Sequence, residues 1–543
     1  MTPSSFMNKR IYIQDWLELK PYAKPTAVDD YYLKLSNDVQ KVITTDKKAF
    51  ALQMFLDKEQ INLLSCFLTS YFEDLISGTN IWNSFVRMCH RLYGKQLPFY
   101  DLDEYYEEEI NAQDISFLIC YFINSVQEEK FYSPFSTFIT EAAEKIYKLF
   151  DKEWEYAPEN EYLKTFYQID PQEKEYYVAR KLIDRVLFDT YLFYPDTSLR
   201  LQEQISEIFE NKENDDDVMM YIHNSRDGMM FRAHTRLLAL KGQVWVAEIL
   251  GSNHPLHQDF LDISNKILGL FLYKGQDENN IFIEHIASGK KFNLTKRSFE
   301  RSHVLTEVDT ILFLGIVRWQ GEWWFSGTFF KQPFNPDTIL KEKSSMESRA
   351  VVNFLDYQNP EIDEILRKQI LAFKNYNNDS LIAFLPSEKI EEFYKGYMEF
   401  YNETLNLSEK EVRKVKQRLK NDGFIVKEKQ KDFSKLSETG LVFFNPKSGV
   451  EIAFCINSAF PLPSNPYFKE EDSEDDVMYL LMHESFSKEL VLYCIEHCKS
   501  RLSFFADGVG KRYLEDFDFL LRFWKKGSYH TVPSITLVGK DKA

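Results

Sequence analysis

Four residues in the C-terminal region are of the types that serve as metal ligands in proteins. Cys494 and Cys498 lie four positions apart, so on a helix their thiols share one face, and His497 lies beside that face. With His483 they would begin a zinc site, because zinc is held by three or four converging thiolates and imidazoles. The competing interpretation is that both cysteines are buried, where a free thiol acts as a small hydrophobic group. No Cys-x-x-Cys pair accompanies them, so we favour packing and predict no cofactor.

A second group combines guanidinium groups with indole rings, as a platform for single-stranded nucleic acid does: Arg297, Arg301, Arg318, Trp319 and Trp324. The rings would stack on bases and the guanidinium groups would bind phosphates. The competing interpretation is core packing, because side chains alternate across a strand and many of these rings must point inward. We favour packing, since a net charge of −18 also opposes general binding to a phosphate backbone.

The segment 408–421 is the other candidate for nucleic acid. Its pattern predicts a helix with a narrow apolar stripe and six basic residues: Lys410, Arg413, Lys414, Lys416, Arg418 and Lys420. A strand and a turn are predicted after it, which is the arrangement of a winged helix. A solvated amphipathic helix explains the same pattern, and we favour that interpretation.

Other residue groups give weaker indications of chemistry. Residues 100–114 form the densest acidic run, but they lack the Asp-x-Asp-x-Asp-Gly spacing of a calcium loop, so we predict a solvated loop. His254 and His257 form an H-x-x-H pair without a third ligand nearby. The motifs GxSxG, HExxH, GxGxxG and the P-loop are absent. An enzyme would need a site assembled from distant residues, and we lean against one.

The elements that would position these residues are mainly helical, with one clear exception. Residues 266–336 alternate apolar and polar residues between Gly, Asn and Asp turns, the pattern of half-buried antiparallel strands. We predict five strands there: 269–273, 281–286, 290–295, 310–319 and 322–330. Amphipathic helices are predicted before this sheet. After it we predict helices with three further strands, 424–430, 440–446 and 449–457, and a candidate last strand, 534–538.

Part of this pattern resembles known sequences. The central sheet, with its "SGK" turn, "KRSFERS" and "VDTILFLGIVRWQGEWWFSG", resembles a small β module of bacterial proteins, some of which carry a SEC-C zinc motif. The SEC-C cysteine cluster is absent here, so the resemblance implies no zinc site. From "IYIQDWLELKPY" onward, nearly the whole chain resembles an uncharacterised family of gut-bacterial proteins with a domain of unknown function, a resemblance that implies no activity.

Length and composition complete the prediction. A chain of 543 residues, 44% of them hydrophobic, needs several domains and can bury their cores. We predict an α+β protein with a helical domain (1–236), a small central β domain with a preceding helix (237–337), and a C-terminal α+β domain (338–543). The sheet of the central domain is predicted to be a small antiparallel β-barrel or curled sheet. Six cysteines form no disulfide framework, and no apolar stretch suggests a membrane span, so we expect a cytoplasmic location. A non-catalytic protein-interaction or scaffold role is our first functional hypothesis, with an unidentified protein partner; a nucleic-acid-associated role is second.

Overall fold

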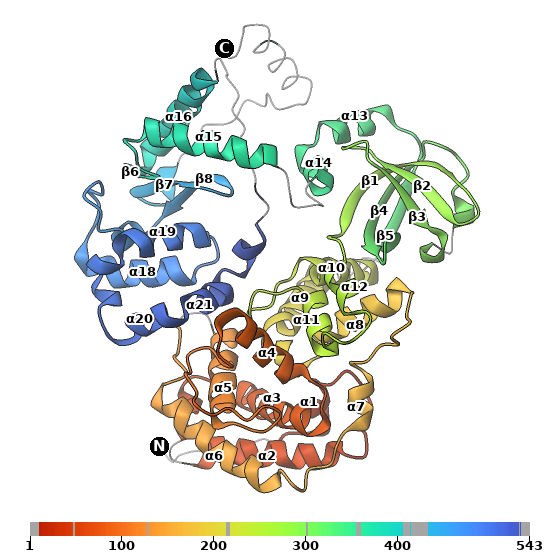
Figure 1. Ribbon diagram of the computed structural model, residues 1–543, viewed down its shortest axis with the longest axis vertical. Coiled ribbons are helices and arrows are strands. Elements are labelled where there is room, and N and C mark those ends of the chain that lie inside the picture. Colours follow the sequence, from red (N-terminus) through yellow and green to blue (C-terminus); the bar gives the residue numbers. More distant parts are fainter. Residues whose placement is uncertain are drawn as a thin grey trace. The chain divides into compact units, whose positions relative to one another are not determined.

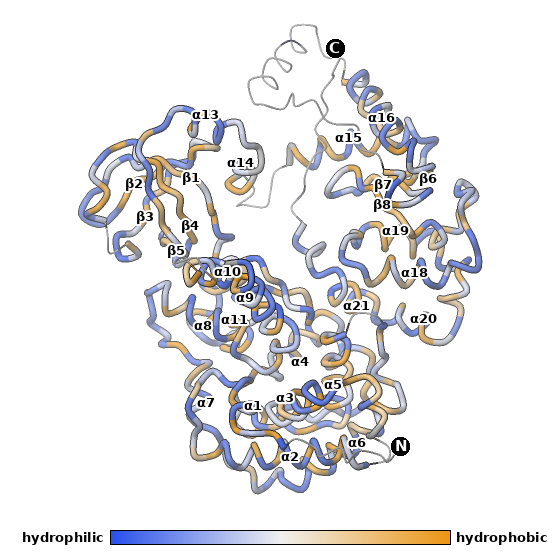
Figure 2. Tube along the Cα trace, turned by 180° about the vertical axis from the view of Figure 1, so that it is seen from behind, coloured by the Kyte–Doolittle hydropathy of each residue, from blue (hydrophilic) through white to orange (hydrophobic). Residues whose placement is uncertain are grey.

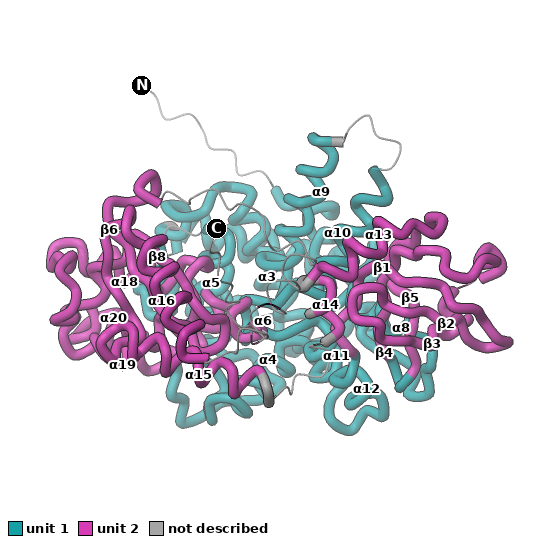
Figure 3. Tube along the Cα trace, turned by 90° about the horizontal axis from the view of Figure 1, so that it is seen from above, with its two compact units in different colours: residues 1–263, 319–321 teal, residues 264–318, 322–543 magenta. Residues whose placement is uncertain are grey.

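A computed structural model describes residues 10–46, 49–127, 130–212, 218–299, 302–353, 360–405, 413, 433–531 and 533 (Figure 1). The chain divides into two compact units, Met1–Ile263 with Trp319–Gly321, and Ser264–Arg318 with Glu322–Ala543 (Figure 3). Helices build the first unit, and a barrel, a small sheet and further helices build the second. The predicted α+β class is therefore confirmed. Of the helices described, none combines the length and the apolar character needed to cross a membrane.

Unit 1 is a helical array. Its helices are α1 (Ile13–Leu17), α2 (Asp29–Thr45), α3 (Lys58–Ser77), α4 (Ile81–Tyr93), α5 (Ala112–Val126), α6 (Thr137–Glu153), α7 (Glu161–Thr165), α8 (Tyr176–Phe188), α9 (Leu199–Lys212), α10 (Val218–Arg232), α11 (Gly242–Leu250) and α12 (His257–Leu261). The segment Gly242–Leu250, whose apolar sequence fits either a helix or a strand, forms the helix α11.

Helix α3 lies at the centre of this array. Asp57 caps its first turn together with Gln60, and Gly78 ends it with a left-handed φ of 60°. Its buried residues lie on all sides of the helix rather than along one stripe, and α5 is buried in the same way. Two acidic residues, Glu73 and Asp74, are therefore carried into the interior by α3.

Unit 2 begins with a closed five-stranded barrel in the order β1-β2-β3-β5-β4. The strands are β1 (Ile267–Gln276), β2 (Asn280–His285), β3 (Lys291–Thr295), β4 (Ile311–Trp319) and β5 (Glu322–Gln332), and Figure 2 shows hydrophobic stretches along them. The five predicted strands are confirmed, with one difference: β3 and β5 pair in parallel, Leu294 opposite Trp323. Helices α13 (Pro336–Ser344) and α14 (Met346–Asn353) pack on the barrel through Ile339 and Val352.

The barrel interior contains one histidine, His285. The ring is fully buried, its Nδ1 lies 2.9 Å from Ser288 Oγ, and its Nε2 has no hydrogen-bond partner among the described residues. The ring packs edge-on to Phe271 and so closely against Gly269 that a Cβ there would lie 2.9 Å from Nε2. Burial lowers the pKa of His285 to about 4, because the charged ring would lose its hydration.

This histidine makes the barrel sensitive to acid. Between about pH 6.5 and pH 4 the unfolded chain binds a proton at His285 and the folded chain does not, so the free energy of unfolding falls as the pH falls through this window. We expect a loss on the order of 3 kcal/mol, complete near pH 4. Hydrogen exchange of barrel amides in the full chain at several pH values measures this change in the free energy of unfolding. His285→Asn should lose less stability between about pH 6.5 and pH 4. An equal loss in this variant would contradict the assignment of the acid sensitivity to His285.

The rest of unit 2 is a three-stranded sheet, β6-β7-β8, with helices. Its elements are α15 (Pro360–Tyr376), β6 (Ile382–Pro386), α16 (Ile390–Thr404), β7 (Thr439–Asn445), β8 (Gly449–Phe454), α18 (Ser473–Met482), α19 (Lys488–Cys498), α20 (Gly508–Tyr513) and α21 (Phe517–Trp524). The strand predictions at β7 and β8 are confirmed. Strand β6 was not predicted, and its Pro386 is tolerated because β6 is an edge strand. Apart from Arg413, the predicted helix 408–421 lies outside the described residues, as do the predicted strands 424–430 and 534–538.

Candidate functional site

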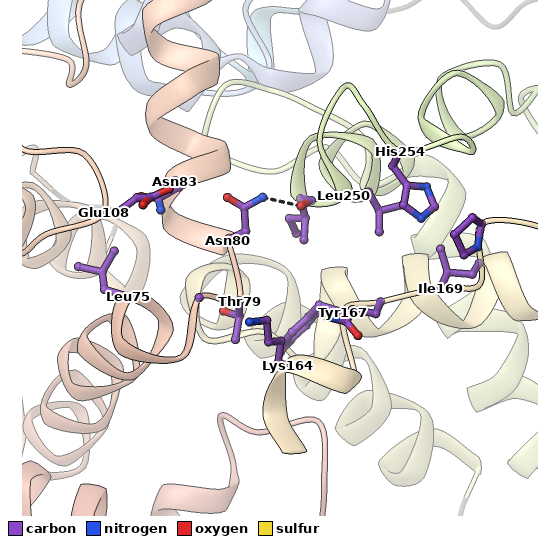
Figure 4. Close-up of a pocket in the computed structure, with 14 residues that line it drawn as sticks. Leu75, Thr79, Asn80, Asn83, Glu108, Lys164, Tyr167, Ile169, Leu250 and His254 are labelled. Carbon is purple, nitrogen blue, oxygen red and sulfur yellow. Dashed lines mark hydrogen bonds between the residues drawn. The ribbon is translucent and has the colours of Figure 1, made fainter. Parts of the chain in front are cut away.

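A pocket of about 780 Å³ opens inside unit 1 (Figure 4). Its walls come from the α3–α4 connection, one residue of the acidic run, α7 with the segment after it, and the end of α11. The lining residues are Leu75, Gly78, Thr79, Asn80, Asn83, Glu108, Lys164, Tyr167, Gln168, Ile169, Pro171, Ile249, Leu250 and His254. A concave site with a few converging polar groups is the usual form of a small-molecule site.

Asp74 holds the first wall in place. Its carboxylate accepts hydrogen bonds from the backbone N–H groups of Ile81 (3.2 Å) and Trp82 (2.7 Å), and from the hydroxyls of Thr79 and Tyr191. Two orphan N–H groups at the start of α4 are thus satisfied from within the fold. Burial raises the pKa of this carboxyl although these donors oppose the shift. The turn that presents Asn80 to the pocket is therefore rigidly held.

Asn80 joins this turn to the α11 wall. The residue has a left-handed φ of 68°, and its side-chain N–H donates to the carbonyl of Ile249 at 2.6 Å. Arg87 donates to the Asn80 Oδ1 at 2.8 Å and to the carbonyl of Glu248 at 2.8 Å. Arg91 binds the buried Glu248 carboxylate through two hydrogen bonds of 2.8 Å each. Side chains of α4 therefore fix the end of α11.

Asn160 positions the α7 wall. Its Oδ1 accepts from the Leu163 N–H at 3.0 Å, which caps α7, and its Nδ2 donates to Glu73 at 2.8 Å. Glu73 in turn forms an ion pair with Lys20, and both side chains are almost completely buried. Burial raises the pKa of Glu73 even though the Lys20 ammonium lowers it. The buried α3 carboxylates Glu73 and Asp74 thus support two walls of one pocket.

Several polar groups on the pocket surface have no protein partner in the described part of the chain. Lys164 is half-buried, and its Nζ lies near Gly78, where an added Cβ would be 3.8 Å from it. Asn83 and Gln168 make no side-chain hydrogen bond with any described residue. His254 accepts from the Leu256 N–H through Nδ1 at 3.2 Å, so the neutral ring carries its proton on Nε2. An ammonium group, two carboxamides and an imidazole N–H are available to a ligand.

Comparison with known proteins gives one match. Residues 10–314 match the DUF3843 family, described as a protein of unknown function, and this segment is more than half of the 543 residues. The chain belongs to this family. No curated protein and no solved structure matches it. The DUF3843 segment includes every residue that lines the pocket, so the pocket is part of the family's own domain.

The structure places the predicted metal ligands on and near α19. Cys494 and Cys498 are buried, and the Cys494 thiol donates to the carbonyl of Ala459 at 3.2 Å. His497 is exposed and stacks on Tyr493, while His483 follows α18 and contacts Ser485. Within the described ranges, no three His, Cys, Asp or Glu side chains are grouped to hold a metal ion. Packing accounts for both thiols, and metal binding at these residues stays a prediction.

The predicted nucleic-acid residues are divided between interior and surface. The indole rings of Trp319 and Trp324 are buried, so neither face is open to a base. Arg297 lies over Trp324 at 4.6 Å and 3.6 Å from Glu322. Arg318 is exposed, and Arg301 lies outside the described residues. Packing accounts for the two rings, and nucleic-acid binding by the arginines stays a prediction.

No predicted site coincides with the pocket, although two of the weaker groups contribute a residue each: Glu108 belongs to the acidic run 100–114, and His254 to the H-x-x-H pair. Its polar groups come from residues 78–83, 108, 164–168 and 254, which are far apart in the chain. A further signal in the sequence was the pair Glu73 and Asp74, two acidic residues within an apolar helix, because charges are rarely buried without a specific role.

Proposed function

We propose that the protein is a non-catalytic binding protein whose helical unit holds a small ligand with an anionic group in the pocket beside Lys164. The observation that supports this proposal is the Lys164 ammonium, which projects into a polar pocket and pairs with no acid among the described residues. A cation in such a place binds a carboxylate or phosphate through charge-assisted hydrogen bonds. Ligand binding would then signal to a protein partner.

The walls support binding by a preorganised site. Three buried carboxylates form hydrogen bonds that fix the wall segments: Asp74, Glu73 and Glu248. A pocket whose walls are already fixed loses little conformational entropy when a ligand enters, which increases affinity. The carboxamides of Asn83 and Gln168 would add hydrogen bonds that orient the ligand.

Replacement of Lys164 tests this function. We expect glutarate and inorganic phosphate to raise the melting temperature of the full chain in a saturable way. Lys164→Met should weaken this binding by about 1.5–3 kcal/mol, at least tenfold, because a charged hydrogen bond is lost. Lys152→Met, on the exposed surface of α6, is the matched control and should leave binding unchanged. Equal binding by wild type and Lys164→Met would contradict the proposal.

A nucleic-acid role for the barrel is the second candidate. The strand order β1-β2-β3-β5-β4, closed by a parallel β3–β5 pair, is the connectivity of the OB-fold, which often binds oligonucleotides. The fold alone is an analogy and does not establish function.

Three further predictions belong to the proposal as a whole: a cytoplasmic location, a gut-bacterial origin, and a likeness of the barrel to the β module of SEC-C proteins.

A further inference from the structure

We infer that the pocket ligand is a small zwitterion, a molecule with one ammonium group and one carboxylate, in which Glu108 binds the ammonium and Lys164 the carboxylate. This inference rests on the proposed function, because it requires the same pocket to bind a ligand. It adds the chemical class of the ligand. It also assigns a role to Glu108, which a ligand with only an anionic group would not require.

Glu108 is the acidic group of the pocket wall. It is exposed, and its side chain forms no hydrogen bond or ion pair with a residue in the described ranges. Its charge acts on the Arg87 guanidinium, which is already engaged with Asn80 and the Glu248 carbonyl. A carboxylate at this place favours a cationic group in the ligand and disfavours a second anionic one.

The turn that carries Glu108 is firmly held. Glu108 has a left-handed φ of 65°, which is uncommon for a residue other than Gly, Asn or Asp. The Asn111 side chain donates to the carbonyls of Tyr106 (3.0 Å) and Glu109 (3.1 Å), on both sides of Glu108. Tyr105 donates to the buried Asp114 at 3.0 Å, which fastens the same segment to α5. A strained backbone that its surroundings fix in this way is typical of ligand sites.

The acidic and basic groups are separated within the pocket. Figure 4 shows Glu108 beside Asn83 at one side and His254 at the other, with Lys164 between them. The ammonium of Lys164 and the Nε2–H of His254 are donors for a carboxylate, whereas Glu108 accepts from an ammonium. The uncharged Asn83 lies on the acidic side and can orient either end of the ligand.

A matched pair of probes tests the inference. Glutarate and 4-aminobutyrate each contain three methylene groups and differ in one end, a carboxylate or an ammonium. We expect the full-length wild type to bind 4-aminobutyrate about tenfold more tightly, because the change at that end replaces repulsion by attraction. Glu108→Gln should reduce this preference to about twofold or less, since its amide is neutral and nearly isosteric. Calorimetry measures both affinities, and the homologous series from 3-aminopropionate to 6-aminohexanoate reports the preferred spacing.

The outcomes separate this inference from the proposed function. If glutarate binds as tightly as 4-aminobutyrate and Lys164→Met weakens both, the ligand is a simple anion and only the zwitterion inference is wrong. If Glu108→Gln leaves the tenfold preference intact, Glu108 is not the ammonium site. If neither probe binds in a Lys164-dependent way, the proposed function itself is wrong. A preference that disappears with Glu108→Gln, together with loss of both ligands in Lys164→Met, supports the inference.

Discussion

Glu73→Leu is expected to lower the free energy of unfolding of the helical unit by about 3–5 kcal/mol. The substitution leaves the Lys20 ammonium, whose side chain is only 2% exposed, without its counter-charge in the interior. It also removes the acceptor of Asn160, which caps α7. Hydrogen exchange of the α3 backbone amides, measured in the full chain, reports this loss directly.

Two further variants show that the loss comes from the unpaired charge. Lys20→Met combined with Glu73→Leu should regain more than half of it, because an apolar pair replaces a buried ion pair at little cost. Lys145→Ala removes the partly exposed ion pair with Asp46 and should change stability by less than about 1 kcal/mol. If the double variant is as unstable as Glu73→Leu, the ion pair does not dominate the effect.

Asp74→Ala should have an effect of similar size, about 3–5 kcal/mol, by a different route. Its carboxylate accepts from two N–H groups of α4 and from the hydroxyls of Thr79 and Tyr191, and all four donors lose their acceptor in the interior. The first turn of α4 and the Thr79–Asn80 wall should open locally. Hydrogen exchange of the Ile81 and Trp82 amides measures this opening.

The same variant connects stability with the pocket. Asp74→Ala should weaken glutarate binding, because Asn80 and Asn83 would lose their fixed positions. It should also reduce the protection of the first α4 amides from hydrogen exchange. Asp74→Asn keeps one acceptor oxygen and should fall between the wild type and Asp74→Ala in both measurements. Unchanged protection of Ile81 and Trp82 in Asp74→Ala would contradict the assigned capping role.

The barrel was the part of the fold that the sequence predicted best. Its strands alternate apolar and polar residues between glycine turns, so the local pattern and the three-dimensional structure agree. The parallel β3–β5 closure has no local signal, because it depends on how the sheet curls. The edge strand β6 was missed because a five-residue apolar run that ends in Pro386 gives little pattern to recognise.

The pocket was not predictable in the same way. Lys164 looks like an ordinary surface residue in its local sequence, Glu108 stood out only as part of a solvated acidic run, and His254 only as half of an incomplete metal pair. Only the packing of the helical unit brings the three to one cavity. The buried supports Glu73 and Asp74 gave a hint, but no spacing rule identifies their distant partners Lys20 and Tyr191. The aromatic and cysteine groups stood out in the sequence mainly because they pack the interior.

Protection of Lys164 from chemical modification tests the central claim most directly. An anionic amine-reactive aryl sulfonate should modify the Lys164 side chain of the ligand-free protein, where the deprotonated amine displaces sulfite from the ring. Mass spectrometry of the full chain gives the rate at each lysine. We predict that increasing glutarate slows modification of Lys164 in a saturable way and leaves Lys152, on the exposed surface of α6, unchanged. A rate at Lys164 that glutarate does not change, or that falls in parallel with the rate at Lys152, would contradict the account.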